Sequence, residues 1–302
     1  MLKSIWDRIK GIFSKVKTYI KKEPKRSLLF GGLILFAVVF IVCVINIVRI
    51  LVQRENGKKI YEQMNEEYVT QHVGDETLED DDVKEGSESV STVIEPLPAV
   101  EEDDPNAWYN LAEVDLTSLQ EKNPDIVGWL YFEDGDSISY PLLYSGDDKY
   151  IDTDYLGEPA EEGAIYIEKY NKPDLSDAHT IIYGHNMANG TMFGKLHKYK
   201  QDTEYIRDHK YFQIITENKI YRYRIFCYKD VNVESSGVFV IYNKPTDDFT
   251  SFIRQKLLPQ SYYLDDTDPE DVQSIITLST CSYDSDVRFI VCGTKIDEHD
   301  LL

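Results

Sequence analysis

Hydrophobic and polar positions divide the chain into regions, the first of which holds one long apolar stretch. This stretch runs from Ser27 to Val48 without a charged residue, and about 20 apolar residues are enough to cross a bilayer core as a helix. It is too long for the core of a cleavable signal peptide, and no small-residue cleavage site follows it. The pattern therefore predicts a retained transmembrane helix over residues 27–52. The alternative, a buried core helix, would rarely run so long without a charge.

The residues before this stretch are basic and predict its orientation. Residues 1–26 hold nine Lys or Arg against Asp7 and Glu23, whereas the whole chain has a net charge of −22. Short flanks rich in Lys and Arg stay in the cytoplasm, so we expect a single-pass protein of the cell membrane with its N-terminus inside. Everything after about residue 52 is then extracytoplasmic. Four Lys or Arg within residues 49–59 oppose this orientation but are fewer.

Apolar residues within 1–26 also recur at spacings of three and four, from Leu2 to Ile20, with lysines between them. This spacing predicts a basic amphipathic helix on the inner membrane surface. Binding of a partner by this helix is the alternative.

Residues 53–104 form an acidic segment. From about Glu62 onward they are rich in Asp, Glu, Ser and Pro and contain few aromatic residues. Such a composition cannot bury enough apolar surface to offset the entropy of ordering, so it predicts a disordered stalk. A flexible coil of about 45 residues reaches on the order of 40 Å. The chain also shows no basic patch of the kind that binds nucleic acid.

Residues 105–302 are rich in Tyr, Ile and Phe and are numerous enough for one domain with its own core. Short β-like runs separated by Gly, Asp, Asn and Pro favour an antiparallel barrel or sandwich over a parallel α/β sheet. The runs are 126–132, 137–144, 163–167, 180–183, 211–216, 219–228, 237–242, 274–280 and 287–295. Helical spacing predicts two helices, at 106–120 before the sheet and at 249–258 in a long connection between late strands.

Three side chains at the edges of β-runs could together perform acyl transfer. Cys281 ends one apolar run, Arg288 opens the next, and His185 follows the run that ends at Tyr183. A thiol, an imidazole and a guanidinium can serve as nucleophile, acid/base and oxyanion partner. Arg288 could instead be a surface ion-pair partner of Asp284 or Asp286.

Three segments resemble class B sortases. They are Asn123-Pro-Asp-Ile-Val-Gly-Trp-Leu, the run from Thr180 to Gly194 around Tyr-Gly-His-Asn-Met, and Thr277-Leu-Ser-Thr-Cys-Ser-Tyr followed by an Arg. The resemblance extends in collinear order over about residues 105–296. It implies a mostly β fold: an eight-stranded sortase-type barrel with an N-terminal helical extension and a helix in the long loop before the Cys strand.

The resemblance also implies a reaction and a set of partners. Cys281 would be the nucleophile, His185 its acid/base partner and Arg288 the oxyanion residue of a transpeptidase that needs no metal and no cofactor. Its substrates would be secreted proteins with a C-terminal sorting signal, and its acceptor an amine of a cell-wall (peptidoglycan) peptide precursor. Tyr183, Ser279 and Thr280 flank the motifs and would line the peptide groove, unless they are ordinary strand residues.

The remaining cysteines and histidines are not expected to take part in catalysis, and Cys43 lies in the predicted membrane span. Cys227 and Cys292 lie inside apolar runs and are interpreted as buried small residues, with a disulfide between them as the alternative. The other five histidines, His72, His179, His197, His209 and His299, match no motif and are not expected to act in catalysis.

Two other functions stay open from the sequence. A pilus-assembling sortase would use a pilin lysine as its acceptor, and a membrane-tethered cysteine protease would let water resolve the thioester. A domain of the same fold that only binds peptides would not need the complete set of Cys281, His185 and Arg288.

Overall fold

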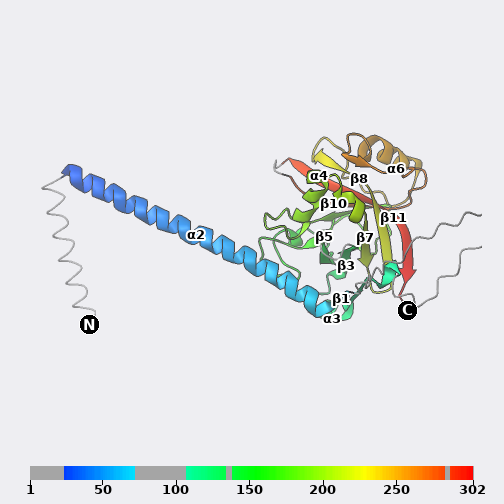
Figure 1. Ribbon diagram of the computed structural model, residues 1–302, viewed down its shortest axis with the longest axis horizontal. Helices are drawn as coiled ribbons and strands as arrows, with labels where there is room; N and C mark the ends of the chain where they lie inside the picture. Colours follow the sequence, from blue (N-terminus) through cyan, green and yellow to red (C-terminus); the bar gives the residue numbers. More distant parts are fainter. Residues whose placement is uncertain (1–23, 72–106, 134–137, 283–285, 302) are drawn as a thin grey trace, which may run out of the picture. The chain divides into compact units, whose positions relative to one another are not determined.

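The computed structural model describes residues 24–71, 107–133, 138–282 and 286–301, and it divides into two units, Met1–Asn56 and Gly57–Leu302 (Figure 1). Most of the predicted amphipathic segment, 1–26, lies outside the described residues. So does the part of the predicted stalk from 72 to 104.

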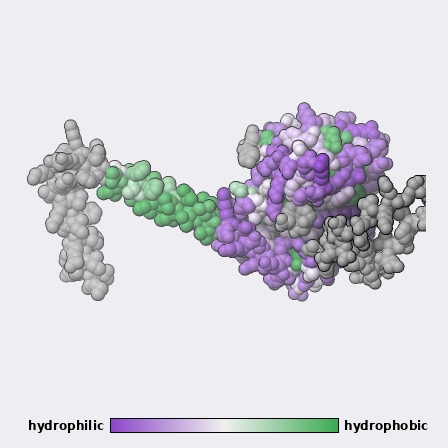
Figure 2. Space-filling model, viewed as in Figure 1, coloured by the Kyte–Doolittle hydropathy of each residue, from purple (hydrophilic) through white to green (hydrophobic). Residues whose placement is uncertain are grey.

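The first unit contains the greater part of helix α2, Pro24–Tyr68. From Leu33 to Val52 its large apolar side chains are exposed, and Figure 2 shows this band as hydrophobic. In the described part of the chain, it is the one helix that is long and apolar enough to cross a membrane. It is therefore a candidate membrane anchor, and it covers the predicted span of 27–52.

The second unit begins inside the same helix. Tyr61, Met64 and Tyr68, spaced as one helix face, are buried in its core, and strand β1 (Val69–Gln71) pairs with β2 (Ala112–Val114). The prediction of a stalk that begins at residue 53 is therefore wrong for residues 57–71. The prediction rested on the acidic composition of this segment and overlooked the apolar residues that form one buried face of a helix.

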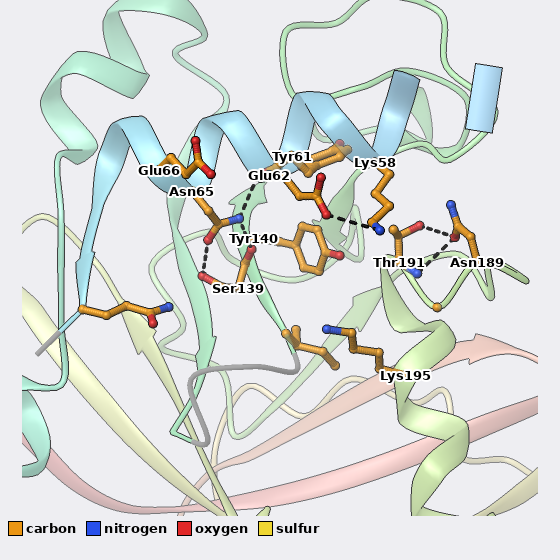
Figure 3. Close-up of a pocket in the computed structure, with 13 residues that line it drawn as sticks. Lys58, Tyr61, Glu62, Asn65, Glu66, Ser139, Tyr140, Asn189, Thr191 and Lys195 are labelled. Atoms are coloured by element: carbon orange, nitrogen blue, oxygen red, sulfur yellow. Dashed lines mark hydrogen bonds and ion pairs between the residues drawn. The ribbon is translucent and has the colours of Figure 1, made fainter. Parts of the chain in front are cut away.

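Polar contacts attach the end of α2 to the sheet beside a polar pocket of about 550 Å³ (Figure 3). Asn65 donates its amide to the Ser139 carbonyl at 3.0 Å and accepts from the Ser139 hydroxyl at 2.6 Å. The Trp129 indole donates to the same hydroxyl at 3.0 Å. Lys58 and Glu62 lie on one wall of this pocket, and Asn189, Thr191 and Lys195 lie on the other.

The second unit is built around a closed barrel of eight strands. Neighbours pair in the order β11-β10-β6-β5-β4-β3-β7-β8, and β8 also pairs with β11, which closes the sheet. The strands are β3 (Ile126–Phe132), β4 (Ser139–Leu143), β5 (Ile165–Ile167), β6 (His179–Tyr183), β7 (Tyr211–Ile215), β8 (Lys219–Asn232), β10 (Ile275–Cys281) and β11 (Val287–Asp300). A two-residue strand, β9 (Tyr263–Leu264), joins β8. The predicted mostly β fold with an eight-stranded barrel is confirmed.

Two apolar clusters pack against the barrel wall: a larger one, here called the inner cluster, which includes the barrel interior and extends to the buried face of α2, and a smaller outer one. Along β11, Phe289 and Val291 belong to the inner cluster, whereas Ile290 and Cys292 belong to the outer one. The outer cluster is covered by α6 (Asp247–Phe252) and its π-helical continuation η4 (Ile253–Leu257). This is the helix predicted at 249–258, and its cover explains why the late strands are apolar on both faces.

Two predicted elements are wrong in detail. The helix expected over 106–120 is instead a short 3-10 turn, η1 (Trp108–Asn110), then β2, then α3 (Leu116–Lys122). Helix α3 starts late because the Asp115 carboxylate caps it, accepting from the Ser118 N–H at 3.0 Å. The run 237–242 is no strand, since only the Val240 and Tyr242 carbonyls bond to strand β6, both through His179.

The buried thiols Cys227 and Cys292 lie directly opposite each other on β8 and β11. Both are free, so no disulfide joins them, and burial raises the pKa of the Cys227 thiol. They are small core residues, as interpreted from the sequence.

Candidate active site

The ends of two neighbouring strands bring Cys281 and Arg288 together. Cys281 is the last residue of β10, Arg288 is the second residue of β11, and the antiparallel register sets them directly opposite each other. Opposed residues point to the same face of a sheet, with Cβ atoms about 4.5–5.5 Å apart. Both side chains are half-buried, so the thiol and the guanidinium share one solvent-accessible face.

The parallel pairing of β6 with β10 brings His185 to the same end of the barrel, where it lines one cleft with Cys281. Ser279 is opposite Tyr183, so two further residues along each chain lead to Cys281 and His185. Gly184, between Tyr183 and His185, packs tightly: a Cβ there would lie 2.4 Å from Ile165 Cδ1. Close packing therefore requires glycine at this position.

The Ile151 carbonyl fixes the orientation of the His185 ring. Its oxygen lies 2.6 Å from His185 Nε2, and a carbonyl can only accept, so the proton of the neutral ring is on Nε2. Nδ1 is then the nitrogen that can exchange a proton. Gly163 makes room for this contact, because its φ is +57° and a Cβ would lie 2.5 Å from the Ile151 oxygen and 3.0 Å from His185 Cδ2.

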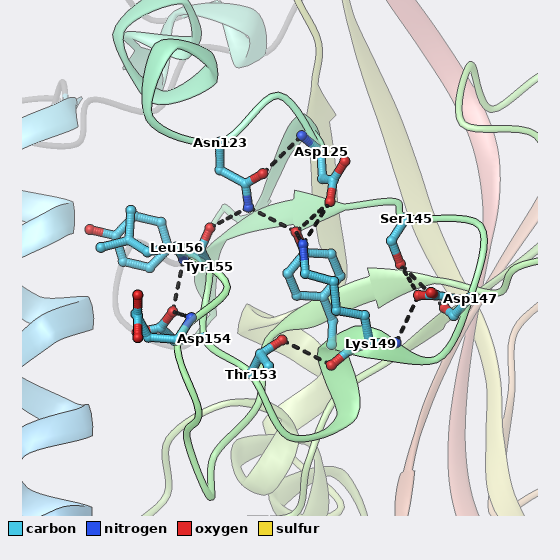
Figure 4. Close-up of polar contacts among 11 residues, drawn as sticks. Asn123, Asp125, Ser145, Asp147, Lys149, Thr153, Asp154, Tyr155 and Leu156 are labelled. Carbon is cyan, nitrogen blue, oxygen red and sulfur yellow. Dashed lines mark hydrogen bonds and ion pairs between the residues drawn. The ribbon is translucent and has the colours of Figure 1, made fainter.

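A network of polar side chains holds the turn that carries Ile151 (Figure 4). This turn is the 3-10 helix η2, Lys149–Ile151. The Asn123 amide donates to the Tyr150 hydroxyl at 2.8 Å and to the Tyr155 carbonyl at 2.6 Å, and the Tyr150 hydroxyl donates to Asp125 at 2.8 Å. Lys149 pairs with the same carboxylate at 3.1 Å. The segment that begins at Asn123 therefore supports the carbonyl that orients His185.

One cleft of about 460 Å³ contains all six residues singled out from the sequence. It is lined by Cys281, His185, Arg288, Tyr183, Ser279 and Thr280, together with Asp148, Ile151, Tyr166, Glu168, Gly184, Val233 and Phe239. The cleft lies at one end of the barrel, where β6 and β10 end and β11 begins. Its exposed surface is mainly apolar, which suits an extended peptide held by its side chains.

Two tyrosines and a glutamate form one side of the cleft. The Tyr166 and Tyr183 rings lie 5.5 Å apart, and burial raises the pKa of both hydroxyls, assisted by the nearby Glu168 carboxylate. Both hydroxyls are therefore neutral at physiological pH and can donate a hydrogen bond. Ser279 Oγ and Thr280 Oγ1 are buried without a hydrogen-bond partner in the part of the chain that the structure describes.

Several residues of the site were not found from the sequence. Ile151, Tyr166, Glu168, Val233 and Phe239 belong to segments that share no motif, and only the barrel brings them together. His197, which was not expected to act in catalysis, does not line the cleft, but its Nε2 lies 3.1 Å from the Cys281 carbonyl oxygen. Among the described residues, no group of three or more His, Cys, Asp or Glu side chains could hold a metal ion.

A closed barrel whose cleft holds a half-exposed thiol beside an imidazole and a guanidinium is the arrangement of a cysteine acyl transferase. Comparison with known proteins identifies the family within this class. The sortase domain family matches residues 138–296. Sortase B of Listeria monocytogenes is 34% identical over 186 residues, which cover 60% of this chain and 74% of that protein.

Solved structures agree with the sequence comparison. Clostridium perfringens sortase B has a TM-score of 0.54 at 25% identity, covering 61% of this chain and 100% of that one. A Staphylococcus aureus sortase B–substrate complex has a TM-score of 0.53 at 26% identity, covering 60% of this chain and 84% of that one. The chain belongs to the sortase family and is a cysteine transpeptidase of class B.

Proposed function

We propose that Cys281, His185 and Arg288 carry out the transpeptidation in two acyl transfers. The Cys281 thiolate attacks the carbonyl carbon of a substrate peptide bond, and Arg288 stabilises the oxyanion that forms. When the C–N bond breaks, the departing amine takes a proton from His185 Nδ1 and a thioester remains. A second amine then attacks the thioester, gives its proton back to Nδ1 and releases Cys281 as thiolate. The observation that carries this proposal is that the register sets Cys281 opposite Arg288 and that His185 lines the same cleft.

The substrates proposed for this cleft are secreted proteins with a C-terminal sorting signal, and the acceptor is an amine of a cell-wall peptide precursor. The apolar lining supports an extended peptide, and Tyr183, Ser279 and Thr280 are proposed to contact it. Exchange of one amide for another requires no nucleotide, which suits a reaction outside the cytoplasm. The existence of an S. aureus sortase B–substrate complex of similar fold supports the proposal that this barrel binds a substrate.

Product analysis tests this function. The full-length chain in detergent is incubated with a peptide selected from a cleavage library, with and without triglycine as the amine acceptor. We expect a product in which the N-terminal fragment is joined to triglycine, because the amine of triglycine attacks the thioester. If hydrolysed fragment alone forms at all triglycine concentrations, the chain acts as a cysteine protease and the transfer function is wrong.

We further propose that α2 anchors the chain in the cell membrane with residues 1–26 in the cytoplasm and the barrel outside. Exposed apolar side chains from Leu33 to Val52 and the basic N-terminal residues support this orientation. In a Cys281→Ala background, a membrane-impermeant maleimide applied to intact cells should label Ser176→Cys, an exposed position of the barrel unit, and not Ser4→Cys. Labelling of Ser4→Cys and not Ser176→Cys would reverse the proposed topology.

A further inference from the structure

Strand β10 continues beyond its pairing with β6. The last pair is Ser279 with Tyr183, whereas β10 ends at Cys281. On the edge of β10 that faces β6, Gly184 N–H donates to the Ser279 carbonyl at 3.2 Å. Carbonyls on one edge of a strand recur every second residue, so the next acceptor is that of Cys281. The chain after Gly184 turns away with His185, and strand pairing therefore ends before it reaches this acceptor.

His197 supplies the donor at this position. Its Nε2 lies 3.1 Å from the Cys281 carbonyl oxygen, and since a carbonyl can only accept, Nε2 carries the proton. The imidazole thus takes the place of the strand N–H that β6 does not provide. A buried carbonyl left without such a donor costs roughly 1–3 kcal/mol, so the contact holds the end of β10 in its extended form.

The His197 ring itself is held firmly. Its residue is 5% exposed, and the ring stacks on Phe289 with 5.1 Å between ring centres. Phe289 is fully buried on β11 and lies opposite Thr280, the residue before Cys281. Burial lowers the pKa of His197, so the ring is neutral at physiological pH. A neutral, packed imidazole is a fixed hydrogen-bond donor.

The same short helix also contacts the backbone of His185. His197 is the last residue of η3, Phe193–His197, and the N–H of the first residue, Phe193, donates to the His185 carbonyl at 3.0 Å. One turn of 3-10 helix therefore binds the backbones of both His185 and Cys281. A shift of η3 would change the separation between the imidazole and the thiol.

We propose that His197 is a positioning residue for acyl transfer: through η3 it holds the Cys281 backbone at a fixed separation from His185. This role rests on the proposed functions of Cys281 and His185. It concerns the rate of the chemical step and not the affinity for the peptide, because His197 does not line the cleft. A displacement of about 1 Å in a reacting group can cost on the order of a hundredfold in rate.

The test compares three variants in the full-length chain in detergent. His197→Ala removes the donor, and its kcat should fall about tenfold to a hundredfold with KM within about twofold of wild type. His197→Gln carries an amide N–H at the position of Nε2 and should recover most of the loss. His209→Ala is the matched control, since His209 also bonds a backbone carbonyl, that of Tyr205 at 2.7 Å, but does not line the cleft. Its kcat should stay at the wild-type value.

A direct readout at the thiol separates this role from general stability. The rate at which iodoacetamide alkylates Cys281 is measured by peptide mass mapping. This rate should differ from wild type in His197→Ala and return towards the wild-type value in His197→Gln. If His197→Ala does not fold, His197→Asn, whose amide is one bond shorter, replaces it and should show the same loss relative to His197→Gln.

Three outcomes would overturn the inference: a folded His197→Ala with kcat within twofold of wild type, a His197→Gln no better than His197→Ala, or an equal loss in His209→Ala. None of these would affect the proposed function, which fails only if the wild-type protein does not transfer a peptide to an amine or if Cys281→Ala still does.

Discussion

Cys281→Ala is expected to abolish peptide cleavage while the barrel stays folded. The substitution removes the sulfur that is proposed to form the thioester, and loss of the nucleophile in a comparable catalytic group costs on the order of a millionfold in kcat. Cys281 is half-buried at a strand end, so its replacement removes little packing. Steady-state cleavage of one selected peptide, with folding checked by circular dichroism, measures the effect.

Cys292→Ala is the matched control for this variant. Cys292 is fully buried on β11 in the outer apolar cluster and does not line the cleft. Its replacement should lower the free energy of unfolding and leave kcat close to wild type. A thiol reagent should correspondingly inactivate the wild-type protein by modifying Cys281 before Cys227 or Cys292. If Cys281→Ala kept most of its activity, another group would have to be the nucleophile.

Arg288→Lys is expected to lower kcat about a hundredfold to a thousandfold although the charge is kept. A guanidinium offers a planar fork of donors, whereas lysine is a point charge on a flexible chain. Removal of one oriented oxyanion donor typically costs roughly 2.7–4 kcal/mol of transition-state stabilisation. Arg288 lies directly opposite Cys281. From this position we propose that its fork contacts the oxyanion formed at the attacked carbonyl.

The control for Arg288→Lys is Arg224→Lys. Arg224 also lies on a barrel strand, β8, where it pairs with Asp265 at 3.1 Å, and it does not line the cleft. That variant should keep wild-type kinetics. A folded Arg288→Lys enzyme with kcat within about threefold of wild type would indicate that Arg288 is only a surface ion-pair partner, for which the sequence offered Asp284 or Asp286. The oxyanion role would then pass to backbone N–H groups.

The barrel could be predicted from sequence because its strands are short, apolar and bounded by turn residues. Strands β3, β7, β8, β10 and β11 all lie where the pattern predicted them, within a few residues. The helix over α6 and η4 was likewise visible from its period. The run 237–242 has the same local pattern as a strand but forms no ladder, since pairing depends on which edges the rest of the chain leaves open.

Some residues of the site could likewise be predicted from local sequence, whereas others are placed there only by the fold. Cys281, Arg288 and His185 stand at the ends of β-runs, and the topology brings strand ends of neighbouring strands together. Ile151 contacts His185 through its backbone carbonyl, and His197 contacts the backbone carbonyl of Cys281. No residue type marks such backbone contacts in a sequence. Residues 57–71 were misread for a related reason, because the acidic composition outweighed three buried side chains at helical spacing.

The central claim is that Cys281 carries the substrate's acyl group as a thioester before an amine receives it. Intact mass analysis of the full-length chain, quenched in acid after brief incubation with the selected peptide, tests this most directly. We predict an added mass equal to the N-terminal peptide fragment, located on the peptide that contains Cys281 and lost when triglycine is added before the quench. Cleavage of the peptide with no adduct on Cys281, or with an adduct that an amine does not remove, would contradict the account.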